Sequence, residues 1–260
     1  MADSIRERAG TTRRRERLVD MVADQRSVED LAEVFGVSAS TIRRDLRALA
    51  ADSKIVRTLG GAVTAQRLER SWHDKTRVEA SAKTHIAQAA VPLVPDGAVV
   101  FIDAGTSAAA LAARLADNPT VTLVTNGLSA AVAVADGRAA LIVLGGKLRR
   151  PTAGMTGMMT VSGLDLVHPH IAFLGCEALD PVLGVNCPDV EVAAFKRRLM
   201  AQCQQSWVLA DHTKFDTTSA FPYWAGLGTS TGVITDSVSA TGQATVLEDL
   251  RARGHDVIVA

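Results

Sequence analysis

The stretch GVSASTIRRDL at residues 36–46 decides the fold of the N-terminal part of the chain. Ser38 is a favoured N-cap residue and predicts a helix that runs from there to about Ala51. At about 100° per residue, one side of this helix carries a polar and cationic stripe made of Ser40, Arg43, Arg44 and Arg47. The apolar side chains Ile42, Leu46 and Leu49 fall on the opposite side. The helix is therefore predicted to pack on a core with one face and to present cations with the other.

The residues before this helix predict a second helix joined to it by a tight turn. Ser27 with Asp30 three residues later has the spacing of a capping box, and Gly36 supplies the turn. The apolar positions of this helix have helical spacing: Val28, Leu31, Ala32 and Phe35. An earlier helix is expected from Thr11 or Thr12 to about Asp24. After the cationic helix, IVRTLGGAV at residues 55–63 predicts two short strands, or a strand and a turn, around Gly60-Gly61.

Two helices joined by a glycine turn, the second cationic near its start, form the helix-turn-helix arrangement that binds DNA in the major groove. Arginine can donate two hydrogen bonds to a guanine edge or to a phosphate. Ser38, Ser40 and Thr41 lie at the N-terminal end of the helix, where backbone N–H groups and the helix dipole favour a phosphate. The alternative is an ordinary solvated, charged helix face. The Gly36 turn and the Gly-Gly hairpin favour double-stranded DNA as the partner.

Composition is consistent with a folded, water-soluble chain. The 260 residues are 47% hydrophobic but only 4% aromatic, and the net charge is zero. No apolar run is long enough to span a membrane, and the N-terminus lacks the apolar segment of a secretory signal, so we expect no membrane partner and a cytoplasmic location. Three cysteines, Cys176, Cys187 and Cys203, fit no metal-ligand spacing and are expected to be free thiols. Neither a metal site nor a cofactor is predicted.

From residue 81 onward, short apolar runs alternate with helical runs, which predicts an α/β domain with a parallel sheet covered on both faces. The expected strands are Ala98–Asp103, Val121–Val124, Ala140–Leu144, Ile171–Leu174, Trp207–Ala210, Gly232–Thr235 and Asp256–Val259. The expected helices are Ser107–Ala116, Leu128–Ala135, Val190–Gln204 and Gln243–Arg253. Residues 1–63 then form a winged helix-turn-helix domain, residues 64–80 a polar linker, and residues 81–260 an effector domain with a Rossmann-like fold.

Polar and glycine-rich loops follow several of these strands, at the sheet edge where ligands of such folds bind. Asp103 ends the first strand and is followed by Gly105, Thr106 and Ser107 at the start of a helix, a favourable place for an anion. Asn126 follows the second strand, and Lys214, a suitable phosphate partner, follows the fifth. A single such loop is typical of an ordinary solvated turn. Several converging loops favour a small anionic ligand.

The segment VSASTIRRDL at residues 37–46, followed by RTLGGA at residues 57–62, resembles the DeoR family of bacterial sugar-metabolism repressors. Leu59 stands where that family usually has histidine, and Ser53 where a glycine is common. The resemblance continues through the D-x-GTT turn at residues 103–107, where Ser107 replaces the second threonine, the TN at residues 125–126, the LGG at residues 144–146 and the E-x4-K at residues 191–196. The element at residues 212–215 is also similar, with His212 in place of the usual serine.

The resemblance implies an effector domain similar to ribose-5-phosphate isomerase that binds a phosphorylated sugar. It implies the following sets of functional residues. DNA contacts are expected from Ser38, Ser40, Thr41, Arg43, Arg44, Arg47 and Arg57, and effector contacts from Asp103, Gly105, Thr106, Ser107, Asn126, Glu191, Lys196 and Lys214. For Glu191 and Lys196 the alternative is a pair within one helix.

The expected function is that of a transcriptional regulator, most simply a repressor of a carbohydrate-catabolism operon. A phosphorylated sugar modulates its binding to operator DNA, and the repeated half-sites of operators call for a dimer or tetramer. One rival is a sugar-phosphate isomerase-like enzyme that carries a DNA-binding module, with Asp103 and Glu191 as acid and base. The other is a constitutive DNA-binding protein whose second domain only oligomerises.

Overall fold

The computed structural model describes residues 14–15, 17–18, 28–51, 55–58, 61–64, 69–218 and 220–260, with backbone alone at residues 50–51, 55–58 and 61–64. The chain divides into two compact units, Met1–Glu69 and Arg70–Ala260. Each unit has an apolar core of its own, as expected of separate domains.

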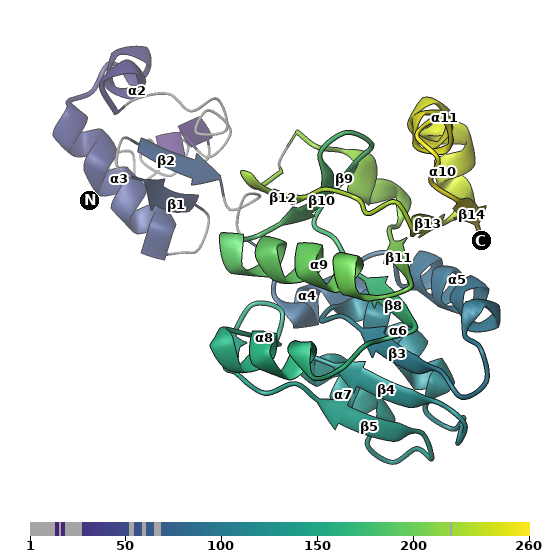
Figure 1. The fold of residues 1–260 in the computed structure, drawn as a ribbon. Coiled ribbons are helices and arrows are strands. Elements are labelled where there is room, and N and C mark those ends of the chain that lie inside the picture. Colours follow the sequence, from purple (N-terminus) through teal and green to yellow (C-terminus); the bar gives the residue numbers. More distant parts are fainter. Residues whose placement is uncertain are drawn as a thin grey trace. The chain divides into compact units, whose positions relative to one another are not determined.

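The first unit contains a helix-turn-helix followed by a hairpin (Figure 1). Helix α2 (Val28–Phe35) and helix α3 (Ala39–Ala51) are joined by a turn at Gly36. The φ of Gly36 is 60°, a left-handed conformation that glycine adopts without strain. Strands β1 (Ile55–Thr58) and β2 (Gly61–Thr64) pair antiparallel. The predicted winged helix-turn-helix is confirmed.

The core of the first unit consists of the apolar side chains that helical spacing predicts. They are Leu18, Val28, Leu31, Ile42, Leu46 and Leu49, all buried. Residues 14–15 and 17–18 are helical, in agreement with the expected first helix. The caps expected at Thr11 or Thr12 and at Ser27 lie outside the described residues.

The second unit is built on a seven-stranded sheet with parallel pairing throughout. Its strands, in chain order, are β3 (Val99–Ile102), β4 (Thr122–Thr125), β5 (Ala140–Val143), β8 (Ile171–Leu174), β11 (Gln205–Leu209), β13 (Thr231–Thr235) and β14 (Val257–Val259). All seven predicted strands are present, with bounds that differ by no more than about two residues. The predicted α/β class is confirmed.

The order of the strands reverses at one point of the sheet. The order is β14-β13-β11-β8-β3-β4-β5, so the chain starts in the interior at β3, extends outward through β4 and β5, and then returns to β8 on the other side. The strand order therefore reverses between β3 and β8. In doubly wound folds, ligands bind outside the carboxyl ends of the strands at this reversal.

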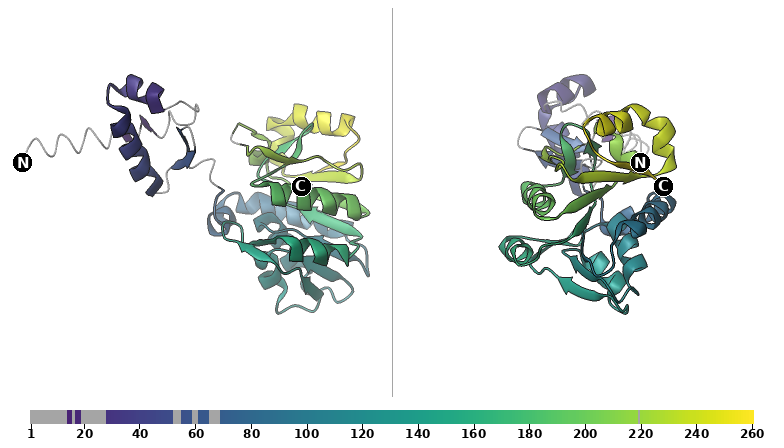
Figure 2. Two further views of the ribbon diagram at one scale, coloured as in Figure 1. Left: turned by 60° about the vertical axis from the view of Figure 1, so that its left-hand side comes forward. Right: turned by 45° about the vertical axis from the view of Figure 1, so that its right-hand side comes forward.

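Helices cover both faces of the sheet, as the views in Figures 1 and 2 show. Helices α5 (Ala80–Ala90), α6 (Thr106–Leu115) and α7 (Leu128–Val134) share one apolar core with Val100 and Ile102 of β3. Helices α8 (Met158–Asp165), α9 (Val190–Gln202) and α11 (Ala244–Ala252) share the other core with Phe101. Successive side chains of β3 thus enter opposite cores, which explains why the strand is apolar throughout.

Several shorter elements were not predicted. A hairpin of β6 (Lys147–Arg149) and β7 (Gly154–Thr156) follows β5, and helix α10 (Ser237–Gly242) follows β13. A small antiparallel sheet is formed by β9 (Leu179–Asp180), β10 (Gly184–Cys187) and β12 (Tyr223–Ala225). The 3-10 turns η2 (Val91–Leu93) and η3 (His212–Phe215) complete this unit. No described helix has the length and apolar character needed to cross a bilayer.

The structure differs from the sequence prediction at the linker, because residues 70–80 of the expected 64–80 linker belong to the second unit. Helix α4 (Trp72–Arg77) forms there, capped by Ser71, whose Oγ accepts a hydrogen bond from the backbone N of Asp74 at 3.2 Å. The Trp72 backbone N also donates to the Pro151 carbonyl at 2.5 Å. The polar composition suggested a linker, but Ser71 and Asp74 have the spacing of a helix start.

Candidate functional site

Helix α3 separates its polar and apolar faces as predicted. The polar stripe of Ser40, Arg43, Arg44 and Arg47 is exposed, whereas Ile42, Leu46 and Leu49 are buried. Since all three arginines emerge on one side of a helix that is anchored from behind, their guanidinium groups are available to an external polyanion.

The N-terminal end of α3 gathers three hydroxyl groups. The backbone N of Thr41 donates to Ser38 Oγ at 3.2 Å, so Ser38 caps the helix. Ser38 Oγ also lies 2.8 Å from Ser40 Oγ and 2.9 Å from Thr41 Oγ1. Hydroxyl donors at the positive end of a helix dipole are suited to contact a phosphate.

The three arginines of the stripe differ in their surroundings. Arg43 donates from Nη2 to Glu29 Oε1 of α2 at 2.9 Å, in an ion pair whose side chains are 49% and 66% exposed. Arg44 and Arg47 make no ion pair with any described residue. Any contact between Arg43 and DNA therefore has to compete with Glu29, whereas Arg44 and Arg47 have no such competitor in the described part of the chain.

Asp45 is a structural residue that sequence reasoning did not assign. Its side chain is 2% exposed, and its two carboxylate oxygens accept from Arg14 Nε at 2.7 Å and Arg15 Nε at 2.9 Å. This pair of contacts fixes the N-terminal helix beneath α3. Asp45 follows Ile42 by three residues and so shares its buried face, which is the signal that could have identified this role.

The remaining predicted DNA contact, Arg57, lies in the wing. Its backbone pairs with Ala62 across the β1–β2 hairpin, but its side chain is outside the described part of the structure. Leu59, which replaces the histidine of the resembling family, is also outside the described residues.

A buried ion pair occupies the reversal point of the sheet. Lys196 Nζ lies 2.9 Å from Asp103 Oδ2 and donates to the Gly175 carbonyl at 2.5 Å, while the Gly175 backbone N donates to Asp103 Oδ2 at 3.1 Å. Burial disfavours the charge on Lys196, but the Asp103 carboxylate outweighs that effect and raises the pKa of the ammonium above its ordinary value. These contacts join the carboxyl ends of β3 and β8 to α9.

The turn after Asp103 is held by close backbone packing. Gly105 has a φ of 143°, which side-chain-bearing residues rarely adopt, and it precedes α6 without a side-chain cap. Ala104 fits between two glycines, since a Cβ on Gly127 would lie 2.7 Å from Ala104 Cα and one on Gly154 would lie 2.8 Å from Ala104 Cβ. The N-terminus of α6, with Thr106 and the buried Ser107, is therefore rigidly placed.

Asn126 supplies an unsatisfied acceptor at the same edge. Its Nδ2 donates to the Met155 carbonyl at 3.2 Å, whereas its buried Oδ1 has no hydrogen-bond partner in the described structure. A buried polar atom without a partner lowers stability by about 1–3 kcal/mol, and a ligand hydroxyl can remove that cost.

Lys214 belongs to a group of cations that sequence reasoning only partly identified. The half-buried Lys214 lies in η3, and its charge acts on Lys83, Cys176 and Glu177. Burial lowers the pKa of Lys83, with Asp211 acting in the opposite direction. Lys83 donates to the carbonyl of Lys75 at 2.5 Å and also to that of Val78.

Two acidic groups and a thiol complete this part of the edge. Burial would raise the pKa of Glu177, but its ion pair with Lys75 dominates and lowers that pKa. Asp211 is buried, and its Oδ2 is without a hydrogen-bond partner among the described residues. Burial raises the pKa of the Cys176 thiol to about 12, so this cysteine is protonated at neutral pH and unsuited to act as a nucleophile.

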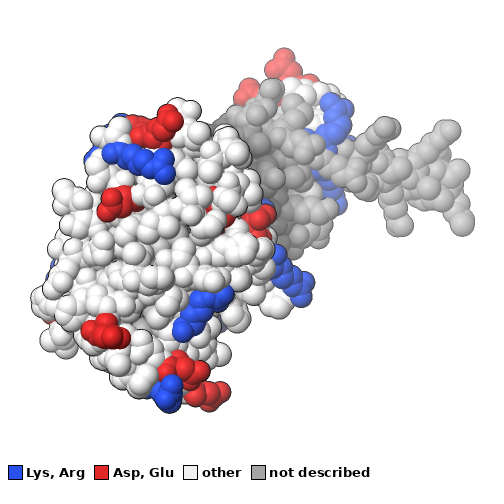
Figure 3. Space-filling view, turned by 90° about the vertical axis from the view of Figure 1, so that its right-hand side faces the viewer, with Lys and Arg blue, Asp and Glu red and all other residues white. Residues whose placement is uncertain are grey.

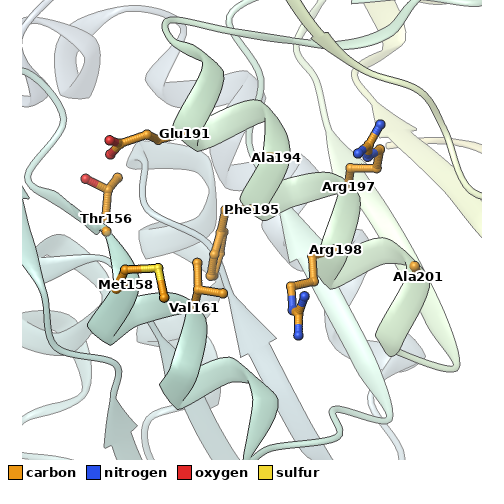
Figure 4. A pocket seen from close by; sticks show the side chains of 10 residues that line it. Thr156, Met158, Val161, Glu191, Ala194, Phe195, Arg197, Arg198 and Ala201 are labelled. Carbon is orange, nitrogen blue, oxygen red and sulfur yellow. The ribbon is translucent and has the colours of Figure 1, made fainter.

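The structure separates Glu191 from Lys196. Lys196 is buried against Asp103, whereas Glu191 is exposed and lines a cleft between α8 and α9 (Figure 4). The alternative of a pair within the helix is therefore wrong: five residues correspond to about 140° around a helix, so the two side chains point in different directions. No group of three or more His, Cys, Asp or Glu side chains in the described structure is arranged to hold a metal ion.

The charges on the surface of the second unit are mixed. On the face shown in Figure 3, Lys and Arg are scattered and interspersed with Asp and Glu, and no continuous cationic surface is formed there. On α3, by contrast, the exposed Arg43, Arg44 and Arg47 share one side of a single helix.

Two family models match the chain. The DeoR-like helix-turn-helix domain matches residues 14–67, and the DeoR C terminal sensor domain matches residues 78–237. These matches cover both units described above.

Whole-chain relatives agree with these matches. The chain is 31% identical over 257 residues to a "Putative aga operon transcriptional repressor" of Escherichia coli O157:H7, covering 96% of this chain and 94% of the relative. It is 32% identical over 249 residues to the "HTH-type transcriptional regulator GlpR" of Haloferax volcanii, with coverage of 94% and 96%. It is also 31% identical over 210 residues to the "Glycerol-3-phosphate regulon repressor" of Escherichia coli K12, with coverage of 78% and 82%.

Among solved structures, ribose 5-phosphate isomerase A of Methanocaldococcus jannaschii matches with a TM-score of 0.38 and 20% identity over 51% of this chain and 52% of that one. A likeness at this level carries no information on activity. The family matches identify a regulator of transcription rather than an enzyme, which removes the isomerase alternative. This chain belongs to the DeoR family of DNA-binding transcriptional regulators.

Proposed function

We propose that this chain is the repressor of a carbohydrate-catabolism operon and that a phosphorylated sugar, bound at the carboxyl edge of the sensor sheet, modulates its affinity for operator DNA. The relatives named as repressors of an aga operon and of a glycerol-3-phosphate regulon support the biological role. Support for the ligand class comes from the polar groups at the reversal point of the sheet.

The observation that carries the proposal is the combination of cations and an unsatisfied acceptor at this edge. Lys214 follows β11 at the carboxyl edge of the sheet, close enough to Lys83 for the two charges to interact, and two neighbouring cations are suited to a phosphate. Asn126 Oδ1 lacks a partner and is suited to accept a hydrogen bond from a sugar hydroxyl. Gly105, Thr106 and Ser107, at the start of α6, are suited to offer backbone N–H and hydroxyl donors to the same ligand.

The Asp103–Lys196 pair has a different role in this proposal. Both groups are buried and satisfy each other, so we propose that they hold the β3 and β8 loops in place beneath the ligand. The contacts with Lys196 and Gly175 use Oδ2 of Asp103, so its other carboxylate oxygen, Oδ1, is proposed to accept a hydrogen bond from a ligand hydroxyl. Glu191 lies in the cleft between α8 and α9, so we propose that it does not contact the effector.

On the DNA side, we propose that Arg44 and Arg47 make the principal contacts from α3, with Ser38, Ser40 and Thr41 at a phosphate. Arg43 contributes after release from Glu29, and Arg57 contributes from the wing. The two half-sites of an operator require at least a dimer. Regulation follows from linkage: the ligand shifts the balance between DNA-competent and DNA-incompetent states according to its differential affinity for them.

The test measures operator binding and thermal stability in parallel. Glycerol 3-phosphate, hexose 6-phosphates and hexose 1-phosphates are compared with the unphosphorylated sugars and with inorganic phosphate. We expect at least one phosphorylated sugar to raise the melting temperature and to change operator affinity, and the Lys214→Ala variant to lose both effects. If the chain binds operator DNA but no phosphorylated sugar alters either quantity, the constitutive DNA-binding alternative is correct and the sensing proposal fails.

A further inference from the structure

The outer face of α9 and the adjoining part of α8 form a cleft of about 570 Å³ that none of the proposed DNA or effector contacts except Glu191 touches. Figure 4 shows Glu191 near one end of the exposed part of α9 and Arg198 further along, with Phe195 and Val161 between the two helices. The cleft is lined mostly by apolar and small side chains: Met158, Val161, Ala194, Phe195 and Ala201.

Large apolar side chains are exposed on, or directly next to, the two helices that form this cleft. Met158 and Met159 at the start of α8 are 79% and 73% exposed, Leu166 at the end of α8 is 86% exposed, and Val190 at the start of α9 is 62% exposed. Single exposed apolar residues are common on proteins, but four of them on two neighbouring helices, with Met158 lining an apolar cleft between these helices, are typical of a surface that is covered in an assembly.

The charges on α9 specify what covers it. Glu191 and Arg198 are seven residues apart, so they lie within about 20° of each other on the helix and about 10.5 Å apart along its axis. Glu191 has no ion-pair partner among the described residues, and Arg198 has Asp165 of α8, in an exposed contact. One helix face therefore carries a negative group at its N-terminal end and a positive group at its C-terminal end.

We propose that this face binds a second copy of the chain, with the two α9 helices antiparallel across a two-fold axis close to Ala194. In that arrangement Glu191 of each subunit faces Arg198 of the other, and both ion pairs form at once because the two-fold axis generates the second from the first. The exposed small residues Ala194 and Ala201 allow the helix axes to approach closely, while the methionines of α8 lie beside the contact.

The mixture of charges favours this partner over others. A surface that binds DNA or an acidic membrane needs positive charges. This face carries both signs, in an order that is complementary to the same face of a second copy turned end to end. A parallel arrangement would place Glu191 against Glu191 and Arg198 against Arg198, which opposes binding. The face thus selects one orientation of a second copy.

The test uses charge reversal in the full-length protein, followed by sedimentation velocity over a range of concentrations. Glu191→Arg places two arginines opposite each other at both ends of the interface, and Arg198→Glu places two glutamates there. We expect each variant alone to weaken self-association by about tenfold or more. Mixing the two variants restores complementary pairs at both ends, so the mixture is expected to associate as a heterodimer.

The matched control is Glu248→Arg on α11, an exposed helical position with the same change of charge. Its association is expected to equal that of the unaltered chain. Arg198→Glu also removes the contact with Asp165, so melting temperatures are measured to verify that each variant is folded. A monomeric unaltered chain at tens of micromolar, or association that is unchanged in both variants and in their mixture, would overturn the proposal. The ligand-response assay described above is read separately and does not depend on this result.

Discussion

The cations of α3 and the charged groups at the sensor sheet edge are organised in opposite ways. On α3, Arg44 and Arg47 are exposed and have no ion pair within the described structure, and the whole stripe lies on one side of one helix. At the sheet edge, Asp103 and Lys196 are buried, come from distant parts of the chain and neutralise each other. Only the first arrangement leaves its charge for an outside partner.

Residue type and position in the sequence therefore do not distinguish a binding residue from a framework residue. Lys196 and Lys214 were both predicted to contact the effector. In the structure, Lys196 forms an ion pair with Asp103 and a hydrogen bond with the Gly175 carbonyl. Lys214 is half-buried, with both positively and negatively charged groups near it. Substitutions of framework residues should therefore lower stability, and substitutions of open residues should lower affinity alone.

The largest effect is expected from Lys196→Met. This change leaves the Asp103 carboxylate buried beside an apolar side chain, so the free energy of unfolding of the sensor domain should fall by about 3–5 kcal/mol. Urea unfolding followed by fluorescence measures the loss. The double variant Asp103→Asn with Lys196→Met should recover part of it, because the uncompensated charge is gone. Unchanged unfolding of Lys196→Met would show that the pair does not support the fold.

The next effect is on affinity rather than stability. Arg44→Ala is expected to weaken operator binding by about 1–3 kcal/mol if the guanidinium contacts bases, with the unfolding curve unchanged because the side chain is exposed. A gel-shift titration at fixed salt gives the loss. The exposed Glu33→Ala on α2 serves as a control that alters the same domain. Binding by Arg44→Ala equal to that of the unaltered chain would remove Arg44 from the interface.

A smaller effect is expected where the sensor domain begins. The ion pair of Lys75 with Glu177 is mostly buried, so Glu177→Gln should lower the free energy of unfolding by about 1–2 kcal/mol at neutral pH. Because the folded pKa of Glu177 lies below its ordinary value, this contribution is fully present above pH 4.5 and is lost as the pH falls through the folded pKa. The gap between the two proteins should narrow on acidification.

Urea unfolding between pH 7 and pH 3.5 tests this expectation. Asp180→Asn provides a control carboxyl without an ion pair to a described cation. If the gap between Glu177→Gln and the unaltered chain widens as the pH falls, the sign of the linkage is wrong.

Sequence patterns predicted the central sheet because each strand is an apolar run between two helices, and β3 and β8 show this clearly. They did not predict β6, β7 or β10, since Lys147–Arg149 and Gly154–Thr156 are too short to show alternation and Gly184–Cys187 contains Gly184 and Asn186. Helix α8 was missed because Met158–Asp165 contains Gly163 and β-branched residues, which are weak helix formers.

The candidate site was predictable only where its signals are local. Asp103, Gly105 and Asn126 follow strands directly, and Ser38 precedes a helix, so their positions could be inferred from neighbouring residues. The partner of Asp103 is Lys196, which lies far from it in the sequence, and the partner of Lys75 is the similarly distant Glu177. Contacts between residues so far apart in sequence have no periodic signature, and the fold itself has to be known to assign them.

The smallest expected effect concerns the one arginine of the α3 stripe that has a partner. Arg43 and Glu29 form an exposed pair, which stabilises the domain by less than about 1 kcal/mol. Glu29→Gln frees Arg43 and removes a negative charge beside the stripe, so operator affinity should rise by a few fold while stability hardly changes. In the Arg43→Ala background the same substitution should give a smaller gain, because no guanidinium remains to be released. Equal gains in both backgrounds would mean that Glu29 acts only through long-range repulsion of DNA and that Arg43 stays paired in the complex.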